Sequence, residues 1–470
     1  MRTRFYSTIL LLASLVTLAF AVVSGLEENY FREWRGYQRE YAKQTEGEKP
    51  FEQGLKQYYL PELGRIDRCT TCHVGVFNTD MAEADQPLRT HPGEYLFDHQ
   101  PQEYGCTLCH AGQGLATNSL EAHANDPHEK VFWDEPVYSS TYVQASCRTC
   151  HASSWLSDNG APVLSKGAEL FTNLGCNSCH KTGGLGGSRG PALDGIGSQP
   201  HGHFSMAHLD EPHTVEHWQE AHLRDPQSVV EGSAMRNYGL SEDDVSALGV
   251  YLMSLRDIRV PEKMIHSRDS LDRDNPNGQI IYQRYCSGCH DAGMEDRKDS
   301  VLNWRVPAIR NPAFTSVAGA EFIRNTINHG RPGTPMESMG STSSGLSSRE
   351  IDALVAYIME GAEGVEVEPW TFVDEDDEVD VDEGRELYND SCKMCHGEFG
   401  EGGKDGLSLT SPTLSAMPDE FFLITVRDGR EGTSMNSARE ELEFEDYEIA
   451  SVVAYIRKLQ EQASKKTAAR

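Results

Sequence analysis

Three observations in the sequence predict a mainly α-helical protein built from consecutive parts. An uncharged stretch of 22 residues, 5–26, lies near the N-terminus. A short motif of two cysteines followed by a histidine occurs six times. In the second half of the chain, three segments repeat one pattern, in which a helix with apolar periodicity leads into the motif and a second such helix closes the segment.

The N-terminal stretch is long enough to cross a membrane, which takes about 20 apolar residues. Arg2 and Arg4 precede it and favour an N-terminus on the cytoplasmic side. A cleaved signal peptide is the alternative, because Ala19-Phe20-Ala21 resembles a cleavage site. The aromatic and basic segment 29–41 favours an anchor. We therefore predict that residues 1–28 form a transmembrane anchor or signal.

All twelve cysteines belong to Cys-x-x-Cys-His motifs, the attachment signature of c-type haem. The two thiols bind the haem covalently, and the histidine binds the iron as proximal ligand. A zinc site would need two such pairs, or a distant histidine pair, for each metal. A redox dithiol does not need the histidine. We predict six covalently bound haem c groups, held by Cys69, Cys72, Cys106, Cys109, Cys147, Cys150, Cys176, Cys179, Cys286, Cys289, Cys392 and Cys395, with His73, His110, His151, His180, His290 and His396 as proximal ligands.

Haem attachment and charge both restrict where the protein works and what it contacts. Covalent haem is attached on the outer side of an energy-transducing membrane, so we expect the chain on the periplasmic side of the inner membrane. The chain has 42 basic and 73 acidic residues, a formal charge of −31. This charge argues against nucleic acid as a partner. It suits docking to basic patches on soluble redox partners.

Residues 29–160 are predicted to form one compact, loop-rich module with three haems, because three motifs lie within 66–151. That density is too high for three separate domains. Residues 90–124 resemble multihaem cytochromes in which a His-Pro or an Ala-His supplies the second axial ligand of a neighbouring haem. The distal ligands expected from this resemblance are His91, His99 and His123, with His128 in reserve. Which histidine serves which iron is left open.

The three repeated segments open with GAELFTNLGCNSCH (167–180), GQIIYQRYCSGCH (278–290) and GRELYNDSCKMCH (384–396). Their closing helices are predicted at 240–255, 346–361 and 444–459. These copies resemble class I cytochrome c domains, expected at 161–265, 275–365 and 384–463. Residues 267–277 separate the first two copies, and an acidic linker, 373–383, separates the last two.

The resemblance also implies how each class I haem is held. The haem would lie between the first and last helices of its copy. A carbonyl after the motif would accept a hydrogen bond from the proximal imidazole and so fix its orientation. The residues expected to supply these carbonyls are Pro191, Pro307 and Pro412.

Two similar heptapeptides, GRPGTPM (330–336) and GREGTSM (429–435), resemble the distal loop of this family. Met336 and Met435 are therefore expected as distal ligands. In copy one the equivalent is Met235, which lacks the Gly-Arg lead-in. Alternatives are Met339 for Met336, Met417 for Met435, and a histidine of segment 201–222 for Met235; His266 and His329 are expected to be surface or loop residues.

Ligand chemistry suggests a direction of electron flow. Methionine on a histidine-bound haem raises the reduction potential relative to a second imidazole. We expect electrons to pass from a quinol-oxidising membrane partner, such as a cytochrome b subunit, through the N-terminal module to the class I domains and a soluble acceptor. The alternative is a haem enzyme in which one iron lacks a distal ligand and converts a small molecule such as nitrite or peroxide. No catalytic residue is predicted, and the N-terminal anchor argues against a conducting filament.

Overall fold

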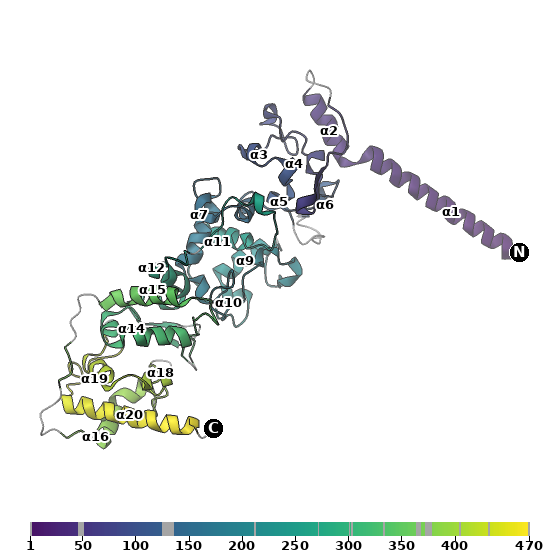
Figure 1. Ribbon diagram of the computed structural model, residues 1–470. Helices are drawn as coiled ribbons and strands as arrows, with labels where there is room; N and C mark the ends of the chain where they lie inside the picture. The colour runs from purple at the N-terminus through teal and green to yellow at the C-terminus, as the bar shows by residue number, and fades with distance from the viewer. Residues whose placement is uncertain are drawn as a thin grey trace. The chain divides into compact units, whose positions relative to one another are not determined.

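The computed structural model shows a mainly helical protein with little sheet, as the sequence predicts (Figure 1). The chain divides into two compact units: residues 1–165, 195–219 and 249–269 form the first, and residues 166–194, 220–248 and 270–470 form the second. The structure describes residues 2–45, 51–124, 136–210, 213–270, 272–299, 301, 304–331, 334–362, 368–371, 378–403, 406–430 and 433–468.

The helices of the N-terminal half are mostly short. In chain order the α-helices up to residue 254 are α1 (Arg2–Leu26), α2 (Glu33–Gln44), α3 (Tyr95–Asp98), α4 (Pro101–Tyr104), α5 (Thr107–His110), α6 (Ser119–His123), α7 (Ser153–Leu156), α8 (Pro162–Asn173), α9 (Val215–Arg224), α10 (Pro226–Val229) and α11 (Glu242–Ser254). A two-stranded antiparallel hairpin, β1 (Tyr58–Leu60) with β2 (Arg65–Asp67), precedes the first motif.

The C-terminal part is more regular. Its α-helices are α12 (Gly278–Tyr285), α13 (Ser287–His290), α14 (Pro312–His329), α15 (Ser348–Met359), α16 (Val381–Leu387), α17 (Lys393–His396), α18 (Pro412–Ser415), α19 (Asp419–Asp428) and α20 (Asp446–Ala468). Strands β3 (Arg297–Asp299) and β4 (Trp304–Val306) pair antiparallel. Gly319, with φ 71°, interrupts α14, which is therefore two helical segments.

Helix α1 is long and apolar enough to cross a membrane. Its apolar stretch, Arg4–Leu26, is 23 residues long, and the most hydrophobic part of this stretch is not buried inside the structure. A signal sequence near an N-terminus has the same length and composition. The helix therefore fits the predicted anchor and the alternative signal equally.

Helix α2 is fixed to the first haem motif by a buried glutamine. The Gln38 side chain donates to the carbonyls of Gly54 (2.8 Å) and Thr71 (2.9 Å) and accepts from the Gly54 N–H (2.9 Å). A fully buried amide needs such partners, because an unsatisfied polar group costs about 1–3 kcal/mol. Nearby, the buried side chains of Tyr41, Met81 and Leu88 form one apolar cluster with partly buried neighbours.

In the second unit, the first and last helices of copies two and three pack directly against each other, where the resemblance implied a haem between them. Helix α12 packs on α15, and α16 on α20. The buried side chains at these contacts are aliphatic or tyrosine, among them Tyr282, Leu354, Ile358, Tyr388, Ile449 and Val452. Helix α16 begins at Val381, inside the predicted acidic linker, of which residues 373–377 lie outside the described part of the chain.

A glycine in each first helix lets the two helices approach closely. A methyl group on Gly384 would lie 1.9 Å from the carbonyl oxygen of Ser451, and one on Gly278 would lie 2.1 Å from that of Ala353. Both opposing atoms are backbone, so the contact cannot be relieved by rotating a side chain. This explains the glycine that opens GQIIY and GRELY in the sequence.

Replacing Gly384 by alanine is expected to destabilise copy three by about 1–3 kcal/mol, the usual cost of overpacking. Thermal unfolding of the haem-loaded protein, followed by haem absorption, would measure the loss. Gly403→Ala is the matched control, because nothing lies within 4 Å of its added methyl group. Equal stability of the two variants would contradict the packing argument.

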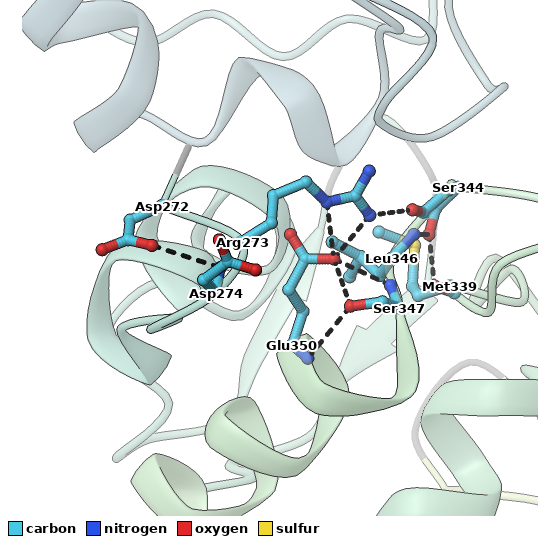
Figure 2. A network of polar contacts seen from close by, with 9 residues as sticks. Asp272, Arg273, Asp274, Met339, Ser344, Leu346, Ser347 and Glu350 are labelled. Carbon is cyan, nitrogen blue, oxygen red and sulfur yellow. Dashed lines mark hydrogen bonds and ion pairs between the residues drawn. The ribbon is translucent and has the colours of Figure 1, made fainter. Parts of the chain in front are cut away.

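A polar network holds the segment between copies one and two against copy two (Figure 2). Glu350 is 1 % exposed and accepts from the guanidinium of Arg273 at 2.6 Å. It also closes a capping box with Ser347 at the start of α15. Arg273 donates a further bond to the Gly345 carbonyl (2.8 Å). The predicted linker 267–277 is therefore anchored at Arg273.

Candidate haem-binding sites

Each motif forms a single tight turn. In five motifs the histidine N–H donates to the carbonyl of the first cysteine, over 2.9–3.0 Å: His73, His110, His151, His180 and His290. In the sixth, His396 ends helix α17. Residues four apart on such a turn lie on the same side. All twelve cysteines are free of disulfides. The turn therefore presents the thiols and the imidazole together, as haem attachment requires.

In the first unit, each of the three predicted distal histidines lies opposite a different proximal histidine. The ring centres are 6.1 Å apart for His73 and His123. They are 6.0 Å apart for His110 and His91. They are 6.1 Å apart for His151 and His99. His128 lies outside the described residues.

These three distances fit two imidazoles that share one metal. A ligating nitrogen lies about 2 Å from a bound metal, with its ring centre about 1 Å further away, so opposed rings have centres about 6 Å apart. Directly packed edge-to-face rings also have centres about 4.5–7 Å apart, so the support for a shared iron is that each pair joins a motif histidine to a predicted distal histidine. The spacing leaves room for an iron between each pair.

Neighbouring groups hold several of these rings in place. The Nδ1 atom of His99 is 3.1 Å from the Tyr95 carbonyl. His151 stacks on Trp155 with ring centres 4.6 Å apart, and His266 lies 5.0 Å from His151. His266 is exposed, as expected, but it contacts the proximal ring of the third motif. Burial, followed by the nearby His123 and His110, lowers the pKa of His73 to about 4.

Asp67, which sequence reasoning missed, ties the first motif to the second. Its buried carboxylate accepts backbone N–H bonds from Cys69 (3.2 Å), Cys106 (2.8 Å) and Thr107 (2.8 Å). Burial alone would raise the pKa of Asp67, but hydrogen bonds from Cys69, Thr107 and Cys106 outweigh it and lower the pKa. The only signal in the sequence was an acidic residue two positions before a motif.

Replacing Asp67 by asparagine is expected to destabilise the first unit by about 2–3 kcal/mol, since hydrogen bonds to a charged group contribute about 1.5–3 kcal/mol. Because the folded pKa is depressed, this stabilisation is present above the unfolded value of about 3.9 and is lost as the pH falls through the folded pKa. Denaturation followed between pH 7 and pH 3 would show a smaller acid-induced loss in the variant. A variant as stable and as acid-sensitive as the wild type would contradict this role.

Consecutive motifs of the first unit lie next to each other. In the first unit, the thiols of Cys69 and Cys106 lie within 4.8 Å, and the Ser146 hydroxyl donates to the Cys109 carbonyl (2.6 Å). The group formed by Asp67, Cys69 and Cys106 is thus part of two haem attachment points, and not a separate metal site.

In the second unit, the fourth and fifth motifs interlock. The Cys179 side chain lies within hydrogen-bonding distance of the Cys289 thiol, and this contact lowers the pKa of Cys289. The Gly288 N–H donates to the Ser178 hydroxyl (3.2 Å), so the two turns are in direct contact.

In each class I copy, the proximal imidazole lies within hydrogen-bonding distance of a backbone carbonyl. Two of the three predicted carbonyls are confirmed, and the third prediction is wrong. Nδ1 of His180 is 2.8 Å from the Pro191 carbonyl, and that of His290 is 3.1 Å from the Pro307 carbonyl. For His396 the partner is Leu407, at 2.9 Å, and not Pro412. Pro412 instead begins helix α18. Such bonds leave Nε2 to face the iron.

The three predicted distal loops each contain a turn with the same hydrogen bonds. Met336 donates its N–H to the Thr334 hydroxyl (3.1 Å), and Met435 donates to Thr433 (3.1 Å). Met235 donates to Ser233 in the same way (3.2 Å). In each turn, the backbone N–H of this serine or threonine also donates to the carbonyl three residues earlier. In copies one, two and three that carbonyl belongs to Val230, Arg331 and Arg430, respectively. Met235 thus occupies the position equivalent to the other two.

The competing methionines are core residues. Met339 is 6 % exposed and Met417 is 9 % exposed, and both belong to the apolar core, whereas Met435 packs at its edge. In the histidine-rich segment, His203, His208 and His213 are exposed. His222 on α9 is different, because burial and the nearby His180 lower its pKa. His329 is exposed, as expected.

Comparisons with known proteins cover the parts that carry these sites. Residues 164–256 match the family model for cytochrome c. Residues 273–358 and 379–456 match that of cbb3-type cytochrome c oxidase subunit III. Residues 105–181 match cytochrome c554 and c-prime.

Two individual proteins show more limited similarity. The chain is 36 % identical over 204 residues to cytochrome c oxidase subunit 2 of Alkalihalophilus pseudofirmus, covering 43 % of this chain and 48 % of that protein. The match thus spans about half the length of the relative. A chain of the reducing HAO-like protein complex of Kuenenia stuttgartiensis is matched over 41 % of this chain and 99 % of its own length, with 17 % identity and a TM-score of 0.25.

The family matches and the site geometry agree. The matched regions contain five of the six Cys-x-x-Cys-His motifs, all except that of Cys69 and Cys72. The turns, the free cysteines and the bonded proximal histidines fit covalently bound haem c. The chain is a multihaem c-type cytochrome, an electron-transfer protein.

Proposed function

We propose that this cytochrome binds six haem c groups and conducts electrons from a membrane quinol-oxidising partner to a soluble acceptor on the periplasmic side. The observation that carries the proposal is the set of three imidazole pairs, whose ring centres lie 6.0–6.1 Å apart. Bound haem supplies one-electron chemistry at each site. The chain's own residues decide the potential of each haem and its distance from the next.

The N-terminal haems would be the low-potential end. We assign His123, His91 and His99 as distal ligands of the haems whose proximal ligands are His73, His110 and His151, respectively. Two imidazoles leave the potential of a haem lower than an imidazole and a thioether do. Helix α1 precedes this module directly in the sequence, and as an anchor it would keep the low-potential end near the membrane.

The class I copies would be the higher-potential end. We assign Met336 and Met435 as distal ligands, supported by their shared turn and by the burial of the competing methionines in the core. For the fourth haem we assign Met235, which makes the same turn. His222 is the alternative for that haem, because it lies near His180.

An optically monitored redox titration of the full-length protein in mild detergent, with a haem count, tests this proposal. We expect six haems in two groups, three of low potential and three of higher potential that show the methionine–iron absorption band. Six low-potential haems with bis-histidine spectra would overturn the ligand assignments and the direction of flow. Rapid carbon monoxide binding by the unmodified protein would instead support the enzyme alternative, because it requires an open iron.

A further inference from the structure

The fourth and fifth attachment turns are in backbone contact at two glycines. Gly175 comes directly before Cys176, and Gly288 lies between the two cysteines of the fifth motif. Both glycines are buried. A methyl group on Gly175 would lie 2.1 Å from the backbone nitrogen of Gly288, and one on Gly288 would lie 2.4 Å from the Gly175 carbonyl oxygen. Because both opposing atoms are backbone, a larger residue at either position would force the two turns apart.

Hydrogen bonds beside this contact hold the two turns together. The Gly288 N–H donates to the Ser178 hydroxyl of the fourth motif (3.2 Å). Arg284, on α12, donates to the side-chain oxygen of Asn177 (2.9 Å). Asn177 is fully buried, and its amide nitrogen donates to the His180 carbonyl (3.0 Å). These bonds connect copy two to the fourth turn and to its proximal histidine.

Further contacts between copies one and two involve residues next to the predicted haem ligands. Arg236, which follows the predicted distal methionine of copy one, pairs with Asp291 at 3.1 Å. Asp291 follows the proximal histidine of copy two. The Ser188 hydroxyl donates to the carboxylate of Glu337 (2.8 Å), and Glu337 follows the predicted distal methionine of copy two. Copies one and two therefore contact each other at the turns and loops that would hold their haems.

The equivalent face of the sixth motif is exposed. Met394 takes the place of Gly288 in this motif, and its side chain is 91 % exposed. Copy three contacts copy two through α19 and α14 instead, where the rings of Phe421 and Phe322 have centres 5.9 Å apart. In the described part of the second unit, contact between attachment turns thus occurs between copies one and two.

The glycine contact decides how close the haems of these two copies can come. The side chains of Cys179 and Cys289 lie within hydrogen-bonding distance of each other. Porphyrins attached through these two sulfurs would have neighbouring edges. Oxidation of one haem adds a positive charge beside the other, and neighbouring unit charges at an effective dielectric constant of about 20 change such an equilibrium by about tenfold.

We propose that Gly175 and Gly288 are positioning residues that make the haems of copies one and two a closely coupled pair, and that electrons cross between these copies at this contact. One electron passes at a time, so that one haem of the pair is oxidised as the other is reduced, without a further reactant. The proposal rests on the proposed haem binding at Cys176/Cys179 and Cys286/Cys289. It does not depend on the methionine assignments or on the direction of flow.

Electron paramagnetic resonance of Gly288→Ala, in the full-length, haem-loaded and fully oxidised protein, tests the pairing. Gly288 lies in helix α13, where alanine is favourable, so the added methyl group acts by displacing the two turns. In the wild type, the spins of the two neighbouring ferric haems should couple and broaden each other's signals. The difference between wild type and variant should therefore contain two haem equivalents. In potentiometric titrations, the redox interaction of these two haems, about tenfold in the wild type, should be smaller in the variant.

Met394→Ala is the matched control, because it changes the equivalent position of the sixth motif, where the side chain is 91 % exposed. We expect this variant to keep the spectrum and the redox interaction of the wild type. An unchanged spectrum in a Gly288→Ala protein with full haem content would overturn the proposal. A difference that contains a single haem equivalent would also overturn it.

If Gly288→Ala does not retain its haems, Ser178→Leu decides the question by the same criterion. This variant removes the acceptor of the Gly288 N–H and places a larger side chain between the turns. The second motif already has a leucine, Leu108, at this position. Six low-potential haems in the wild type would overturn the ligand assignments of the proposed function, while the difference between variant and wild type would still be measurable.

Discussion

Replacing His123 by alanine is expected to open one haem of the N-terminal module to external ligands. The ring centre of His123 lies 6.1 Å from that of His73, the spacing of two imidazoles on one iron. Without its distal ligand, that iron should become high-spin and bind carbon monoxide. Carbon monoxide difference spectra and electron paramagnetic resonance should report one haem equivalent of the predicted six.

The same experiment maps the other two pairs. His91→Ala and His99→Ala should each open one haem, and the double variant of His91 and His123 should open two, because these pairs are separate. His203→Ala is the control, since this histidine is exposed and belongs to no pair. A closed, low-spin spectrum in the His123 variant would show that His123 is not a ligand, and His128 would then be examined in the same way.

The three histidines predicted as distal ligands could be named from the sequence, but the proximal histidines that they face could not. The first motif lies opposite the last of these histidines, His123, and the third motif lies opposite the middle one, His99. This crossed order arises in a region of loops and short helices, for which the sequence has no periodic pattern. The sequence showed which residue type could supply the distal ligands and how many candidates there were. Which distal histidine faces which proximal histidine depends on contacts between residues up to 52 positions apart, as for His99 and His151.

The error at Pro412 has a local cause. The prediction relied on finding a proline after each motif, but the bond is made by a backbone carbonyl, which any residue can supply. Leu407 lies 11 residues after His396, the same separation as Pro191 after His180. Spacing would therefore have identified Leu407, although Pro307 lies 17 residues after its histidine and shows that spacing also varies.

The charged residue that sequence reasoning missed acts through contacts between distant parts of the chain. Asp67 matters because it accepts N–H groups from two motifs that are 37 residues apart. Helical periodicity, by contrast, predicted the closing helices well, because an apolar stripe on a long helix is a local signal.

Replacing Met435 by histidine is expected to lower the reduction potential of the sixth haem by on the order of a few tenths of a volt, since axial ligands set haem potentials over a range of about 0.8 V. The thioether that favours the ferrous state is exchanged for an imidazole. The methionine–iron band should lose the contribution of one haem. Potentiometric titration and near-infrared absorption would measure both changes.

Met417→Leu is the matched control, because Met417 lies in the core of the same copy and is 9 % exposed. Its band and potentials should equal those of the wild type. If Met435→His leaves the band intact and Met417→Leu removes it, the distal ligand is Met417 and the loop assignment is wrong. If the predicted change occurs, the sixth haem approaches the potential of the N-terminal haems, and rapid reduction from that end should leave it partly oxidised. That partial oxidation would connect ligand type to the direction of electron flow, because nothing else along the path differs between the two proteins.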